Sequence, residues 1–258
     1  IIVYYIYSFI INFIIFIYFY ARIFPNSCPP IQTVKSRSEI YKEAFKSIFP
    51  PMILIVLVLG SILMGVATPT ESASVGAVGA AIIAFTKGEL TFQNLKDVSL
   101  NTVKLSSFVF VILIGASMFS LVFRGFNGDA MIEHFLGSLP GGLFTALLIV
   151  MIAIFFLGFF LDYIEIIFVI VPLVGPILIA NGADPLWLGI LISLNLQTSF
   201  LTPPFGFSLF FLRGVAPNEI QTRNMYKGVM PFIGIQVLAI IIVALFPSIA
   251  TWLPNLMF

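Results

Sequence analysis

Long apolar runs, separated by short polar segments, dominate this chain. Most of them approach or exceed the roughly 20 residues that a helix needs to cross a bilayer. The pattern therefore predicts an all-α polytopic membrane protein. The runs are Ile1–Ala21, Ile48–Ala67, Leu105–Phe123, Gly141–Leu161, Ile166–Gly182, Pro185–Leu212 and Gly228–Trp252, with a shorter one at Ser72–Thr86.

Composition agrees with a membrane protein and excludes an ordinary soluble domain. Hydrophobic residues make up 60% of the chain and charged residues 9%, whereas about a quarter of a soluble domain is charged. The single cysteine, Cys28, excludes an internal disulfide and a cysteine-based metal cluster. No basic residue precedes the first apolar run, so residues 1–24 are predicted to be a transmembrane helix and not a signal peptide. The chain begins without Met, and we expect it to be a piece of a longer protein.

The run Pro185–Leu212 contains no charged residue and carries adjacent prolines, Pro203 and Pro204. As one helix it would be roughly 42 Å long, more than the hydrocarbon core of about 30 Å. Proline lacks an N–H and disfavours the α conformation in the residue before it, so the helix is expected to break here. The carbonyl groups of Ser199 and Phe200 would lose their helical partners, which membranes tolerate only inside protein or beside a water-filled cavity. The break is therefore a candidate binding site.

Basic residues orient the predicted spans. Of the twelve Lys and Arg residues, all but Arg124 lie in residues 22–46, 87–104 and 213–227. By the positive-inside rule these segments are cytoplasmic, which makes residues 25–47 a cytoplasmic amphipathic linker. The C-terminus is then expected outside.

A turn between two apolar arms, Gly158–Glu165, carries Asp162 and Glu165 but no Lys or Arg. Residues 141–182 form either two full spans or a re-entrant hairpin with its tip near the midplane, and the missing basic residues favour the hairpin. Carboxylates inside a membrane usually mark a substrate or ion path. Asp162 could bind a cation, cap the following helix, or do both.

A third motif follows the span that begins at residue 48. Thr68, Pro69, Thr70 and Glu71 form an N-terminal capping pattern, with Pro in the first turn and Glu three residues after Thr. Small residues at helical spacing, among them Gly76, then line one face. Such faces usually pack tightly against another membrane helix, and direct contact with a ligand is the alternative.

The sequence argues against an enzyme. His134 is the only histidine, and neither a zinc-protease nor a serine-hydrolase motif is present. No transition metal and no nucleic-acid partner are expected. An ion channel and a purely structural membrane subunit stay open as alternatives to a transporter.

The three motifs occur in a specific order. The segments Gly65–Ala80 (GVATPTESASVGAVGA), Gly158–Pro176 (GFFLDYIEIIFVIVPLVGP) and Asn195–Leu209 (NLQTSFLTPPFGFSL) together resemble the large membrane subunit of tripartite ATP-independent periplasmic (TRAP) transporters, the DctM-like family of the ion transporter superfamily. The resemblance covers essentially the whole chain.

The resemblance implies two inverted repeats, each with a helical hairpin and a broken helix, that work as an elevator. It implies sodium-driven uptake of carboxylate-bearing solutes, with sodium as the coupling ion and no other cofactor. The implied partners are a periplasmic solute-binding protein, a small TRAP membrane subunit and membrane lipid. The chain matches only the second repeat, 48–258, and the helix before it, so the first repeat is expected on a missing segment or a separate polypeptide. Within the repeat we expect scaffold helices at 48–123, the hairpin at 141–182, the broken helix at 185–212 and a last helix at 228–252.

The resemblance also implies residue roles. The hairpin tip and the broken helix resemble the second sodium site of the family, and a solute carboxylate is expected beside the helix that begins after Pro204. Asn195, Thr198 and Ser199 could instead bond to neighbouring helices. The cation-binding candidates are Gly158, Asp162, Ser199, Phe200, Thr202, Pro203 and Gly206, and the substrate-binding candidates are Asn195, Thr198, Pro204 and Phe205.

Overall fold

The computed structural model describes residues 2–25, 36–203, 206–217 and 220–257, and within these ranges the regular structure is helical throughout. The chain divides into two compact units, one formed by Ile1–Ile23 with Phe108–Phe258 and the other by Phe24–Ser107. Among the described helices, those that are long and apolar enough to cross a membrane lie at Ser38–Leu63, Phe92–Gly125, Tyr163–Ala180 and Thr222–Leu245. The predicted all-α polytopic class is confirmed.

The unit Phe24–Ser107 contains α2 (Arg37–Leu63), α3 (Pro69–Thr86) and the first part of α4 (Phe92–Gly125). Ser36 starts α2 with a capping box closed by Glu39. Helix α2 then runs through Pro50 and Pro51 without ending, so the expectation that adjacent prolines must break a helix is wrong here.

The reason for the unbroken helix lies one turn before the prolines. Pro50 and Pro51 have no N–H to donate to the carbonyl groups of Lys46 and Ser47, which a regular helix would pair with them. Lys46 and Ser47 are both exposed. The carbonyl groups of Lys46 and Ser47 can therefore be solvated, and the helix continues.

The linker predicted at 25–47 includes the first part of α2. The part of that linker at 26–35, which includes Cys28, lies outside the described residues.

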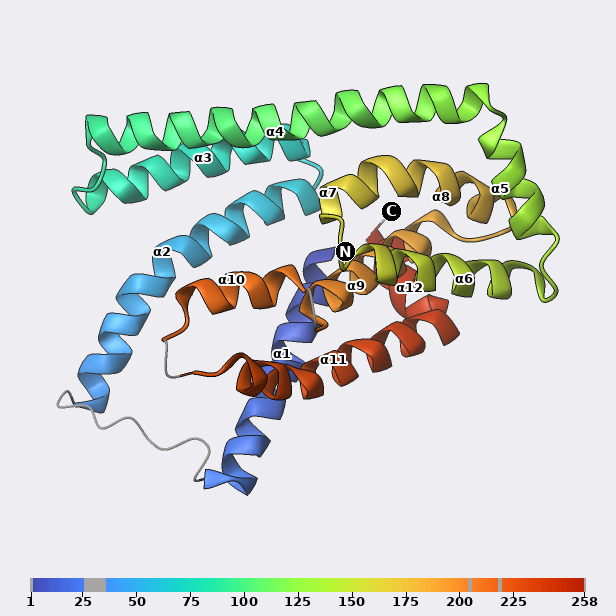
Figure 1. The fold of residues 1–258 in the computed structure, drawn as a ribbon. Helices are drawn as coiled ribbons and strands as arrows, with labels where there is room; N and C mark the ends of the chain where they lie inside the picture. The colour runs from blue at the N-terminus through green and yellow to red at the C-terminus, as the bar shows by residue number, and fades with distance from the viewer. Residues whose placement is uncertain (1, 26–35, 204–205, 218–219, 258) are drawn as a thin grey trace. The chain divides into compact units, whose positions relative to one another are not determined.

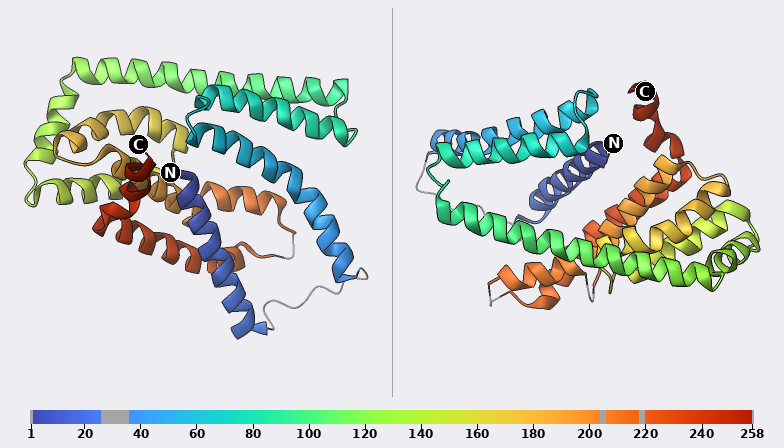
Figure 2. Two further views of the ribbon diagram at one scale, coloured as in Figure 1. Left: turned by 180° about the vertical axis from the view of Figure 1, so that it is seen from behind. Right: turned by 90° about the horizontal axis from the view of Figure 1, so that it is seen from above.

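Helices α2 and α3 pack side by side (Figure 2). The hydroxyl oxygens of Ser61 and Ser72 lie 2.9 Å apart across this contact, and Ser72 is fully buried. A Cβ atom at Gly76 would lie 3.3 Å from the Val58 side chain. The small-residue face that contains Gly76 therefore serves helix packing.

The other unit is built around α9, on which α6, α10, α11 and α12 all pack. Figure 1 shows α6 and α8 running beside each other as the two arms of a hairpin. Rings of α1 residues Phe13 and Phe16 meet the ring of Phe232 from α11. The helices of this unit, apart from the end of α4, are α1 (Ile2–Ile23), α5 (Gly128–Gly137), α6 (Gly142–Leu157), α7 (Tyr163–Glu165), α8 (Val171–Ala180), α9 (Pro185–Leu201), α10 (Phe207–Val215), α11 (Thr222–Leu245) and α12 (Pro247–Met257).

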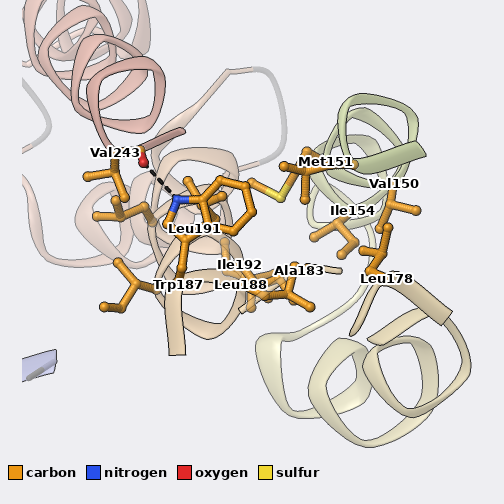
Figure 3. Packing of buried hydrophobic residues seen from close by; sticks show 14 of the residues in the cluster. Val150, Met151, Ile154, Leu178, Ala183, Trp187, Leu188, Leu191, Ile192 and Val243 are labelled. Atoms are coloured by element: carbon orange, nitrogen blue, oxygen red, sulfur yellow. Dashed lines mark hydrogen bonds between the residues drawn. The ribbon is translucent and has the colours of Figure 1, made fainter. Parts of the chain in front are cut away.

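The apolar core of this unit lies between α9 and its neighbours (Figure 3). Ile154, Leu178 and Leu191 are almost completely buried there. The indole N–H of Trp187 donates a hydrogen bond of 2.7 Å to the carbonyl oxygen of Val243. This buried bond fixes the start of α9 against the end of α11.

The last predicted helix, 228–252, is divided in the structure. Helix α11 ends at Leu245, and α12 starts at Pro247. Phe246 lies between them with φ −125° and ψ 75°, because a residue before proline is pushed out of the α region. The short helix α5 (Gly128–Gly137) was not predicted.

Candidate functional site

Helices α6 and α9 run in the same direction, and their ends meet. The side-chain amide of Asn195 on α9 donates a buried hydrogen bond of 2.7 Å to the carbonyl oxygen of Met151 on α6. Further along both helices, Gly158 at the end of α6 meets Ser199. Because α6 and α9 run parallel and meet at both places, the hairpin tip and the end of α9 lie beside each other.

The lengths of these helices agree with a site inside the membrane. Helix α6 has 16 residues and α9 has 17, which correspond to roughly 24 to 26 Å. Each is shorter than a hydrocarbon core of about 30 Å. If both start at one face of the bilayer, both end before they reach the other face.

Gly158 allows the close contact between the tip and α9. A Cβ atom at this position would lie 2.8 Å from the Cβ atom of Ser199 and closer still to its hydroxyl oxygen. A second contact, between the rings of Tyr163 and Phe200, has centroids 6.2 Å apart. The tip thus contacts the end of α9 at two places.

The helix break occurs where the adjacent prolines predict it. Helix α9 ends at Leu201, and Thr202 is extended with φ −86° and ψ 125°. The Thr202 N–H donates to the carbonyl oxygen of Ser199 at 3.1 Å. The Ser199 carbonyl thus loses its helical i+4 partner, as predicted, but it is not left free, because a tighter i to i+3 bond replaces the helical one.

Gly206 restarts the helix after the break. It is buried and caps α10, and its N–H donates to the carbonyl oxygen of Thr202 at 3.1 Å. A Cβ atom here would lie 2.5 Å from the carbonyl oxygen of Phe200, so only glycine fits without a shift. Pro203 is half-buried at the break, and the candidates Pro204 and Phe205 lie outside the described residues.

Hydroxyl groups crowd the last turns of α9, and each of them donates its proton to its own helix. Thr198 donates to Leu194 at 2.7 Å, and Ser199 donates to Leu196 at 2.8 Å. Thr202 donates to the carbonyl of Thr198 at 2.7 Å. Thr198 and Ser199 are fully buried. The sequence left open whether these side chains bond to the protein or to a ligand, and their protons are donated within the protein. The hydroxyl oxygens keep lone pairs that can accept a further bond.

Asp162 caps the second arm of the hairpin. It has the extended conformation of an N-cap residue, and its carboxylate accepts a hydrogen bond of 2.7 Å from the Tyr163 N–H. Asp162 and Glu165 are both half-buried. In the described part of the chain, no group of three or more His, Cys, Asp or Glu side chains is arranged to hold a metal ion.

The second arm of the hairpin contains a π-helical segment that was not predicted from the sequence. Residues Ile166–Ile170 form a π-helical segment, in which the Val171 N–H donates to the carbonyl of Ile166. Pro172 follows and cannot donate to the carbonyl of Phe168. Such segments are common at functional sites, and the spacing of Pro172 and Pro176 in an apolar arm was the available signal.

Comparison with known proteins assigns this arrangement to a family. The family model described as the DctM component of the tripartite ATP-independent periplasmic transporter matches residues 1–249. The chain belongs to the DctM family. Its apolar helices and this membership indicate a multi-pass inner-membrane protein, and the family is one of transporter components and not of enzymes.

Individual members of the DctM family that resemble the chain act on different solutes according to their names. It is 31% identical to the C4-dicarboxylate TRAP transporter large permease protein DctM of Vibrio cholerae, over 95% of this chain and 57% of the relative. It is 27% identical to the sialic acid TRAP transporter permease protein SiaT of Haemophilus influenzae, over 88% and 36%. It is 30% identical to the isethionate TRAP transporter permease protein DctMQ of Oleidesulfovibrio alaskensis, over 75% and 30%. The chain thus spans little more than half the length of the first of these relatives.

Proposed function

We propose that the chain is the second half of the large permease subunit of a TRAP-type transporter, in which sodium influx drives the uptake of carboxylate-bearing solutes. The observation that supports this most directly is the contact of Gly158 with Ser199. It brings a hairpin tip and a helix break together, and broken helices of this kind are where secondary transporters hold their ions and substrates.

The cation site lies where the tip meets the break. Sodium is a hard cation that takes oxygen ligands, and the hydroxyl oxygens of Ser199 and Thr202 keep lone pairs there because their protons are already donated. Asp162 adds negative charge at the tip while its carboxylate also caps α7. The remaining contributors are the backbone groups of Gly158, Phe200, Pro203 and Gly206.

The solute carboxylate lies against the start of α10. A helix N-terminus presents N–H groups and positive partial charge, and the sequence from Gly158 to Leu212 holds no Lys or Arg. The anion is therefore held by backbone donors, hydroxyl groups and the bound sodium. Among the described residues, Asn195 and Thr198 are the substrate-binding candidates, with Asn195 acting through its bond to the hairpin.

The rest of the transporter supplies what this chain lacks. An inverted first repeat completes the solute site and the other sodium site, and the hairpins move together with the broken helices as an elevator. A small membrane subunit packs against the scaffold, and a periplasmic binding protein delivers the solute. With the basic segments in the cytoplasm, the C-terminus lies in the periplasm.

The test is uptake by the complete transporter in liposomes. We expect saturable uptake of a C4-dicarboxylate or of sialic acid that needs the matching binding protein and is stimulated by an inward sodium gradient but not by potassium. Conductance driven by voltage without coupling would instead identify a channel. Full uptake by a transporter with alanine at both Asp162 and Thr202 would assign this region a structural role.

A further inference from the structure

A groove runs along one face of α2 and is not used by the proposed sites. It has a volume of about 920 Å³ and reaches from Tyr41 to Leu57. The described residues that line it all belong to α2, and apart from Lys42 they are apolar or aromatic. Tyr41, Val56 and Leu57 are each more than half exposed. This face of the helix is therefore open to a ligand.

Helix α3 packs on the other side of α2. It contacts Leu54 and Val58 of α2 through two of its glycines. The groove residues Met52 and Val56 each lie two positions before these, about 200° away around a helix of 3.6 residues per turn. Membrane helices that pack on each other place small residues at their contact, as α3 does here. The groove face carries mainly large side chains, which favours lipid over another helix as its neighbour.

The length of the groove matches one leaflet of a bilayer. The apolar run 48–67 is centred at Leu57, which places this residue near the midplane. Lys42 lies roughly 22 Å before Leu57 along the helix. A leaflet extends about 15 Å from the midplane to the edge of the hydrocarbon, and about 20 to 22 Å when the headgroups are included. Lys42 is therefore at the depth of the headgroups, and the groove from Ile48 to Leu57 is at the depth of the acyl chains.

The charge at the headgroup end of the groove is positive. Lys42 is exposed, and Lys46, also exposed, follows one turn later. Glu39 uses its carboxylate in the capping box of α2, and no ion pair between described side chains involves either lysine. Glu43 lies one position after Lys42, about 100° further round and away from the groove. Both ammonium groups are thus available to an anionic headgroup.

We propose that this groove binds one anionic phospholipid of the cytoplasmic leaflet, with its phosphate on Lys42 and Lys46 and an acyl chain along the apolar side chains that reach Leu57. Basic residues next to a membrane span attract anionic lipids of that leaflet. A zwitterionic lipid carries a cation of its own beside the phosphate and gains less from two lysines. The inference concerns the unit Phe24–Ser107 and goes beyond the proposed function, since it involves neither the coupling ion nor the solute.

The test uses tryptophan fluorescence of the complete transporter in detergent micelles, titrated with phosphatidylglycerol or phosphatidylcholine that carries brominated, quenching acyl chains. Phe49→Trp places the reporter in the groove. Phe108→Trp is its matched control, because Phe108 is half exposed on α4 and lies near the cytoplasmic start of the run 105–123. The signal of the transporter without the reporter is subtracted. Lys42→Gln then removes the charge at the groove, and Lys96→Gln makes the same change at an exposed lysine of α4.

We expect phosphatidylglycerol to quench Phe49→Trp saturably and at a lower mole fraction than phosphatidylcholine. Adding Lys42→Gln should raise the mole fraction of phosphatidylglycerol for half of the quenching about fivefold, which is the effect of one basic residue at an anionic membrane surface. Adding Lys96→Gln should leave this mole fraction unchanged. Phe108→Trp should be quenched equally by the two lipids, because it faces bulk lipid.

Four results would overturn the inference. Equal quenching of Phe49→Trp by the two lipids would show that the groove faces bulk lipid only, and no effect of Lys42→Gln would remove the phosphate from this lysine. If neither lipid quenches Phe49→Trp while both quench Phe108→Trp, a protein covers the groove. Potassium phosphate should compete no more than potassium chloride of equal ionic strength; stronger competition would identify an anion site without an acyl chain. Sodium-coupled uptake is measured separately, so the proposed function stands or fails independently.

Discussion

A Cβ atom on Gly158 would lie 2.8 Å from the Cβ atom of Ser199, so the end of α6 meets α9 with no space for a side chain between them. This contact joins the hairpin tip to the helix break. Binding at the break is therefore expected to depend on the position of the hairpin, and a substitution at Gly158 should affect both elements.

The variant Gly158→Ala should disturb this junction. Overpacking of a tight contact usually costs about 1 to 3 kcal/mol, and Ser199 is fully buried and cannot move away freely. We expect a lower Tm of the purified transporter and a marked loss of sodium-stimulated uptake. Gly189→Ala is the control, because Gly189 lies on α9 with nothing within 4 Å of its Cβ position. That variant should keep uptake and gain stability from helix propensity; equal behaviour of the two variants would contradict the prediction.

The variant Thr202→Val should weaken sodium coupling. It keeps the shape of the side chain and removes the hydroxyl oxygen at the break. The sodium concentration for half-maximal uptake should increase about tenfold, while the amount of protein inserted in the membrane stays the same. Thr102→Val makes the same change at an exposed threonine of α4 that also bonds to its own helix, and it should leave uptake unaltered. An unchanged sodium requirement in Thr202→Val would remove Thr202 from the site.

The variant Asp162→Asn distinguishes a cation ligand from a helix cap. Asparagine caps helices about as well as aspartate, so the bond to the Tyr163 N–H and the Tm in potassium should persist. The loss of negative charge should nevertheless increase the sodium requirement for uptake. Asp184→Asn is the matched control, since Asp184 caps α9 through the Trp187 N–H and is exposed. If sodium dependence is the same in both variants, Asp162 is only a cap.

Glu71 makes stability depend on pH through the cap of α3. Hydrogen bonds from the backbone N–H of Thr68 and from its hydroxyl group hold the pKa of Glu71 below its ordinary value of 4.5. A carboxylate with a lowered pKa stabilises the folded state above its unfolded pKa, and this stabilisation is lost as the pH falls through the folded pKa. The Tm difference between wild type and Glu71→Gln should therefore be constant from pH 7 to about 5 and shrink below about 4.5. If the Tm difference between wild type and Glu71→Gln stays the same down to acidic pH, the charge of Glu71 does not stabilise the cap.

Much of the architecture could be read directly from the sequence. Helix existence, the membrane class, the break near Pro203 and the capping box at Thr68 follow from hydropathy and from backbone rules that act over a few residues. The same local rules would also break the chain at Pro50 and Pro51, yet both stay inside α2. They also missed the division of the last helix at Pro247. A proline only withdraws a donor, and whether the helix ends depends on what else can satisfy the carbonyl.

The sequence by itself determined which residues are apolar enough for the membrane and where the backbone is prone to break, because these properties depend on composition and nearest neighbours. Only the tertiary structure decided that Met151 accepts the Asn195 amide, that Gly158 meets Ser199, and that the Trp187 indole donates to the Val243 carbonyl. These pairs are far apart in the chain. Their contact follows from how parallel and antiparallel helices align when they bury a shared core, which no local pattern encodes.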